Sequence, residues 1–130
     1  IKIRVAKDKI LNLSEKSSQI KRNNLSDSEI ERISYIENTS SISFRDLYLM
    51  DRVLREKNYN FALRYMLTCF NEISSFLKEY QIESVFSEQT WNFEIITTLA
   101  CNTIGINSYF VDTNESINVI IVANLKNKQS

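Results

Sequence analysis

The sequence predicts a three-layer α/β domain with a short parallel sheet flanked by helices. In one segment two β-rich stretches, Ile82–Ser87 and Ile106–Val111, are separated by Trp91–Ile104, whose apolar residues recur at helical spacing. A short hairpin cannot join parallel strands, so a helix between two strands indicates a parallel pair with a right-handed crossover. A further stretch, Ile117–Ala123, is an almost unbroken apolar run of strand length, which is typical of buried parallel strands.

The N-terminal part of the chain has one strand signal and one strong helix signal. Residues Ile1–Val5 alternate between apolar and polar side chains, as a short strand does. Apolar residues are sparse in 6–20, so any helix there is only weakly amphipathic. Ser26 and Glu29 have the spacing of a capping box, which predicts a helix that runs to about Glu37.

Two more helices are expected before the central segment. Ser43 is a suitable N-cap for a helix from Phe44 to about Lys57. Asn60 is a suitable N-cap for the longest helix, from Phe61 to about Tyr80, whose apolar side chains recur every three or four residues in one broad stripe. Gly105, the only glycine, is expected in the left-handed conformation that ends a helix.

The length of 130 residues fits one domain with its own core. We expect 1–60 to be a mainly helical entry portion and 61–123 to form a helix-strand-helix-strand-strand core. Because the chain starts with Ile1 and ends on a polar tail after an apolar run, we expect it to be a fragment of a two-domain protein.

Composition excludes several classes of function. The 16 basic and 16 acidic residues cancel, so no overall field favours nucleic acid or anionic lipid. The absence of histidine excludes Ser-His-Asp and Cys-His catalysis within the chain and removes the commonest metal ligand. A single glycine excludes a glycine-rich phosphate loop. We therefore expect no cofactor and no metal.

The cysteines and the hydropathy pattern indicate a compartment. Cys69 and Cys101 each lie on a helical apolar stripe, which favours two buried thiols in a reducing cytoplasm over a disulfide or a metal pair. No apolar run is long enough to span a bilayer, and no leader is visible, so we expect a cytoplasmic protein without a transmembrane segment.

The candidate site follows the first central strand, because open parallel sheets bind ligands beyond the carboxyl ends of their strands. There Glu88 is placed to accept a proton from a hydroxyl, the free amides of the helix start could hold an anion, and Trp91 offers a flat face. The same residues also make good local structure, with Thr90 as a helix cap and with Glu88 and Glu94 offsetting the positive helix end. Both interpretations remain open from the residues alone.

Four arginines form a second candidate. Arg45, Arg52, Arg55 and Arg64 could gather around a phosphate, and Arg45 and Arg52 would share a helix face. Acidic residues stand among them, so exposed ion pairs are the favoured interpretation.

A resemblance sharpens the first candidate. The long helix ending in Phe76–Tyr80, the strand followed by Glu88, then Thr90 and Glu94, and the sequence Leu99-Ala100-Cys101 before Ile104-Gly105-Ile106 form one pattern. Over Tyr65–Asp112 it resembles the N-terminal half of bacterial capsule and surface-polysaccharide glycosyltransferases with two Rossmann-like domains (GT-B type). Sugar-nucleotide epimerases have a similar arrangement.

The resemblance implies the acceptor-side domain of a glycosyltransferase. Glu88 would be the catalytic base, and Thr90, Trp91 and Glu94 would shape the pocket for a carbohydrate acceptor. A missing C-terminal domain would hold the nucleotide-sugar donor, so this hypothesis needs a second Rossmann-like half encoded downstream. The alternative is a non-catalytic interaction domain that docks a partner through its long helix.

Overall fold

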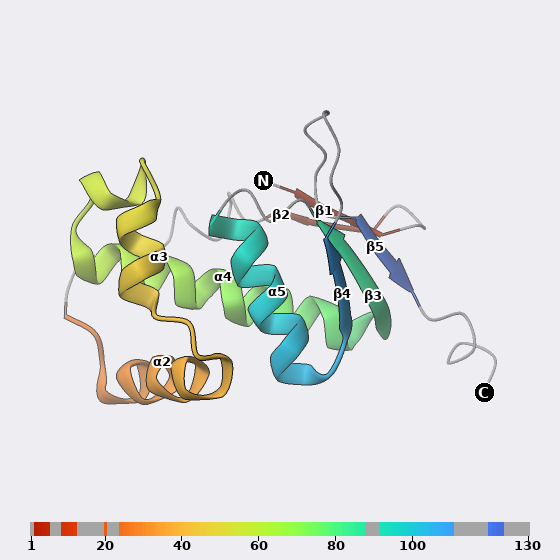
Figure 1. The fold of residues 1–130 in the computed structure, drawn as a ribbon, viewed down its shortest axis with the longest axis horizontal. Helices are drawn as coiled ribbons and strands as arrows, with labels where there is room; N and C mark the ends of the chain where they lie inside the picture. Colours follow the sequence, from red (N-terminus) through yellow and green to blue (C-terminus); the bar gives the residue numbers. More distant parts are fainter. Residues whose placement is uncertain are drawn as a thin grey trace.

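The structure, a computed structural model, describes residues 2–5, 9–12, 20, 24–87, 92–110 and 120–123 (Figure 1). It is a mixed fold of helices and strands, which agrees with the α/β part of the predicted class. Its elements are, in chain order, β1 (Lys2–Val5), β2 (Lys9–Asn12), α2 (Asp27–Ser40), α3 (Phe44–Met50), the 3-10 helix η1 (Leu54–Glu56), α4 (Tyr59–Glu79), β3 (Ile82–Ser87), α5 (Asn92–Ile104), β4 (Asn107–Phe110) and β5 (Ile120–Ala123).

The central prediction, a parallel pair joined by a helix, is confirmed. β3 and β4 pair in parallel, with Ser84 beside Asn107 and Phe86 beside Tyr109, and α5 connects them. Gly105 ends α5 with a φ of 78°, a left-handed conformation that a residue with a Cβ atom rarely adopts.

The sheet as a whole is mixed, so the prediction of a parallel sheet holds only for part of it. The strand order is β2-β1-β5-β3-β4. β5 is parallel to β1 and antiparallel to β3, because these two neighbours run in opposite directions. β2 lies antiparallel to β1, in a region where the sequence indicated at most a weak helix.

The helix that was expected from Phe44 to Lys57 is divided in two. α3 ends at Met50, and Asp51 adopts an extended conformation. The Asp51 Oδ1 atom then accepts hydrogen bonds from the backbone N–H groups of Val53 and Leu54, both at 2.9 Å. An aspartate that captures the two following backbone donors favours a turn over a continued helix, which explains the break before η1.

The other helix starts follow the predicted capping chemistry, with one shift. Ser26 and Glu29 form the complete capping box of α2, which continues three residues beyond Glu37 to Ser40. α4 begins two residues earlier than expected, because Asn58 rather than Asn60 accepts the hydrogen bond from the N–H of Phe61 at 3.1 Å.

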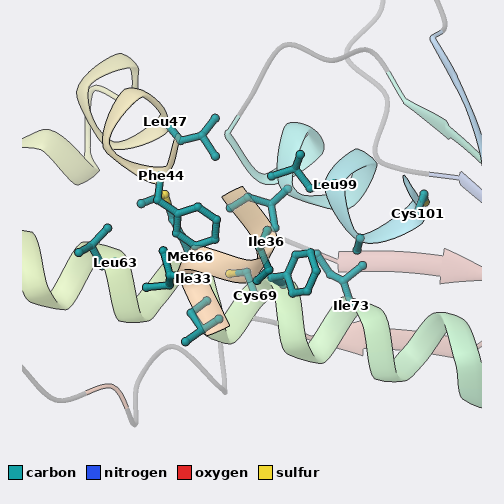
Figure 2. Packing of buried hydrophobic residues seen from close by; sticks show 14 of the residues in the cluster. Ile33, Ile36, Phe44, Leu47, Leu63, Met66, Cys69, Ile73, Leu99 and Cys101 are labelled. Carbon is teal, nitrogen blue, oxygen red and sulfur yellow. The ribbon is translucent and has the colours of Figure 1, made fainter. Parts of the chain in front are cut away.

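α4 is the central element of the core. Its buried residues cover about half of its circumference and are Ala62, Leu63, Met66, Leu67, Cys69, Phe70, Ile73, Ser74, Phe76 and Leu77. Figure 2 shows side chains from α2, α3 and α5 meeting those of α4, with Ile36, Phe44 and Leu99 among them. The apolar stripe of the long helix is therefore occupied by the chain's own core.

The other helices and the strands lie toward the two ends of α4. In Figure 1, α2 and α3 lie toward one end of α4, whereas α5 and the strands lie toward the other. α4 and α5 pack directly against each other, so the sheet does not separate them. Val85 of β3 is buried in the same core.

Candidate functional site

The framework of the predicted site is present at the carboxyl ends of β3 and β4. Because these strands are parallel, both end at the same edge of the sheet, and α5 begins there after the connection from Ser87 to Asn92. Three predicted site residues, Glu88, Thr90 and Trp91, belong to this connection and lie outside the described residues. Their predicted roles stay predictions.

Glu94, the fourth predicted residue, lies in the first turn of α5. It is buried, with 4 % of its surface exposed, and Thr97 one turn further along is also buried. The first turn of a helix has unpaired backbone N–H groups and a partial positive charge, which favour a carboxylate. Glu94 is therefore a buried carboxylate at the positive end of the helix.

An aromatic pair that the sequence analysis missed lies close to the same edge of the sheet. Phe86 and Tyr109 occupy the next-to-last positions of β3 and β4, and their rings stack with centroids 5.1 Å apart and planes inclined by 22°. Tyr109 keeps 47 % of its surface exposed. The pairing depends on the register of the two strands, which sequence spacing alone does not determine.

The β3–α5–β4 unit therefore has a buried carboxylate in the first turn of its helix and an exposed aromatic ring near the end of its second strand. No protein-family model, curated protein or solved structure matches this chain. The chemistry of the site thus has to be argued from its own residues. A flat ring beside hydrogen-bonding groups suits a small polar ring with one apolar face.

Two of the four arginines of the second candidate pair with carboxylates. Arg64 pairs with Glu29, with 2.7 Å between Nε and Oε2 and 2.9 Å between Nη2 and Oε1. Arg52 lies beyond the end of α3, so the prediction that it shares a helix face with Arg45 is wrong. Arg55 and Glu56 form a loose, exposed pair at 4.0 Å.

The Arg64–Glu29 pair is a structural tie between α2 and α4. Arg64 Nη2 also donates to the carbonyl oxygen of Asn24 at 2.9 Å. The hydrogen bond from Arg64, aided by those from Ser26, lowers the pKa of Glu29 from 4.5 to about 2. Glu29 is thus held as a carboxylate that caps α2 and binds Arg64 at once.

Both cysteines are free and buried, as expected. Burial raises the pKa of Cys69 and of Cys101 to about 12, so neither thiol is ionised near neutral pH. The thiolate is the nucleophilic form of cysteine, so burial disfavours the reactive form of both side chains. None of the described helices is both long and apolar enough to cross a membrane.

Proposed function

We propose that this chain is the acceptor-side domain of a glycosyltransferase-like enzyme of surface-polysaccharide synthesis, with its sugar site at the carboxyl ends of β3 and β4. The observation that carries the proposal is the stacked Phe86–Tyr109 pair next to the carboxyl ends of β3 and β4. The apolar face of a sugar ring packs well on an exposed aromatic ring, while its hydroxyl groups need polar partners.

The proposed roles follow from position. Glu88, directly after β3, accepts the proton of the acceptor hydroxyl, and Thr90 and Trp91 border the pocket. Glu94, which is buried in the first turn of α5, helps to position this connection. The proposed domain is Rossmann-like with three layers, which requires a helical layer on the second face of the sheet. A separate C-terminal domain holds the nucleotide-sugar donor. The enzyme would act in the cytoplasm.

The test is Glu88→Gln in the full-length protein. The assay measures release of nucleoside diphosphate from a panel of nucleotide sugars in the presence of oligosaccharide acceptors. A lost general base lowers kcat by about 10²- to 10⁴-fold while folding is unchanged. Glu31→Gln, the same chemical change on an exposed residue of α2, is the control and should leave kcat unchanged. Equal turnover in the wild type and Glu88→Gln would remove Glu88 from the mechanism.

The alternative, a non-catalytic interaction domain, is favoured by a different observation. The apolar stripe of α4 packs into the chain's own core, but Tyr59, its first residue, belongs to an exposed apolar surface between α3 and α4. A protein that releases no nucleoside diphosphate under any of these conditions, yet loses a binding activity when this surface is changed, would support the alternative.

A further inference from the structure

The stacked Phe86–Tyr109 pair lies on the face of the sheet that points away from the helices. Successive side chains of a strand point to opposite faces of its sheet. Val85, next to Phe86 in β3, has only 1 % of its surface exposed, and both α4 and α5 contact β3. The helices therefore cover the Val85 face of β3. Phe86 lies on the opposite face, and Tyr109 lies there too, because it is the register partner of Phe86.

The ring of Tyr109 has one covered side and one open side. Its covered side stacks on Phe86, with the two planes inclined by 22°. β4 is the last strand in the sheet order, so no described strand borders it on the other side. Tyr109 accordingly keeps nearly half of its surface exposed. A ring that a neighbour already holds loses little conformational entropy when a ligand stacks on it.

A polar pair lies beside the aromatic pair on the same face. Ser84 and Asn107, two positions earlier in each strand, are also register partners. Two residues along a strand span about 7 Å, so one small molecule can contact both pairs. Asn107 and Tyr109 are exposed, whereas Ser84 and Phe86 are half-buried. We call these four residues the β3–β4 platform.

The chemistry of the β3–β4 platform indicates which class of ligand fits. An asparagine amide and a serine hydroxyl both donate and accept hydrogen bonds without carrying a charge. The four platform residues therefore offer no partner to a phosphate, a carboxylate or an ammonium group. An uncharged sugar ring has an apolar face for the tyrosine ring and hydroxyl groups for the amide, so it matches all of these groups at once.

We propose that the β3–β4 platform is the acceptor subsite and binds an uncharged sugar ring, which stacks on the open side of Tyr109 and hydrogen-bonds to the Asn107 amide. This inference rests on the proposed function and adds the ligand class, the face of the sheet and the role of Asn107. It also limits the architecture, because a helical layer on the second face of the sheet then has to leave β3 and β4 uncovered.

The test measures saccharide binding to the full chain by NMR titration, in the absence of any nucleotide sugar. The probes are neutral oligosaccharides of glucose, galactose and N-acetylglucosamine, with oligogalacturonate as the acidic counterpart. At least one neutral probe should bind, and more tightly than the acidic one. Tyr109→Ala should raise its Kd at least about tenfold, and Asn107→Ala about fivefold. Tyr109→Phe, which keeps the ring, should bind within about twofold of the wild type.

Tyr35→Ala is the matched control, because Tyr35 is an equally exposed tyrosine on α2, and it should bind like the wild type. Circular dichroism shows whether each variant is folded. Tyr109→Leu, which keeps an apolar contact with Phe86, carries the test if Tyr109→Ala is not folded. Three results would overturn the proposal: no binding of any neutral probe, preferred binding of oligogalacturonate, or a Kd that neither Tyr109→Ala nor Tyr109→Leu raises.

The outcome is separable from that of the proposed function. A chain that binds a neutral probe through Tyr109, in a full-length protein that releases no nucleoside diphosphate, supports the β3–β4 platform and contradicts the glycosyltransferase. A full-length enzyme whose turnover depends on Glu88, but whose KM for acceptor is the same in Tyr109→Ala, supports the glycosyltransferase and contradicts the platform.

Discussion

Replacing Arg64 by methionine tests whether the tie between α2 and α4 stabilises the fold. Arg64→Met keeps the alkyl chain but removes both hydrogen bonds to Glu29 and the one to Asn24. The side chains of Arg64 and Glu29 are only 14 and 25 % exposed, so water replaces these bonds incompletely. We therefore expect a clear loss of stability, larger than that of an ordinary surface ion pair.

The size of the loss follows from the pKa of Glu29. A fall from 4.5 to about 2 is about 2.5 pH units, and each unit corresponds to about 1.4 kcal/mol, which gives about 3.5 kcal/mol as an upper limit. Partial exposure screens the interaction, and Ser26 contributes part of the shift, so the expected cost of Arg64→Met is about 2 kcal/mol.

The pH dependence provides an internal check. Because the pKa of Glu29 is lower in the folded than in the unfolded chain, protons bind the unfolded chain first as the pH falls. The stabilisation is complete above pH 4.5, the ordinary pKa, and it is lost as the pH falls toward about 2. The difference in unfolding free energy between the wild type and Arg64→Met should shrink over the same range.

Urea unfolding, followed by circular dichroism at several pH values, measures these differences. Arg55→Met is the matched control, because Arg55 is half-exposed and its nearest carboxylate oxygen is 4.0 Å away. It should change the unfolding free energy by no more than about 0.5 kcal/mol. An Arg64→Met variant as stable as Arg55→Met, or a difference that stays constant from pH 6 down to pH 3, would refute the reasoning.

Three further substitutions or reagents address single features. Ser74→Ala should leave the unfolding free energy unchanged or raise it by up to about 1 kcal/mol, because the buried Ser74 hydroxyl has no hydrogen-bond partner. The control in urea unfolding is Ser75→Ala, at an exposed position. A clear loss of stability in Ser74→Ala would contradict this. Gly105→Ala should cost about 1 kcal/mol in the same assay from its φ of 78° alone, since an added Cβ atom meets no atom within 4 Å; Gly105→Asn should cost less. Cys69 and Cys101 should resist a thiol reagent at pH 8 in the folded chain, because burial raises the pKa of each to about 12. Both should react after the chain is unfolded in urea. Reaction of the folded chain would show that the thiols are accessible.

Local chemistry accounts for most of what the sequence predicted correctly. The capping box at Ser26, the left-handed Gly105 and the β3–α5–β4 order each depend on residues that are near one another in the chain. The parallel pairing of β3 and β4 follows from the same local order, since a helical connection favours it. These features could be predicted from the sequence without knowledge of contacts between distant residues.

Contacts between distant residues account for one part of what was wrong or missed, and a local side-chain contact accounts for another. β5 lies between β1 and β3, more than thirty residues from either in sequence, and nothing local specifies its neighbours. The break after Met50 depends on the side chain of Asp51 reaching two backbone N–H groups, which an apolar periodicity does not register.

The burial of Glu94 divides the candidate site into two kinds of residue. A carboxylate with 4 % of its surface exposed meets few ligand atoms, but at the first turn of α5 it compensates the partial positive charge of the helix. Tyr109, in contrast, offers nearly half of its surface to solvent at the same end of the sheet. If a sugar binds there, contact with it falls to Tyr109 and to the connection between β3 and α5, while Glu94 acts through the backbone that it stabilises. Glu94→Gln should then lower the unfolding free energy more than it weakens acceptor binding, and Tyr109→Ala should do the reverse.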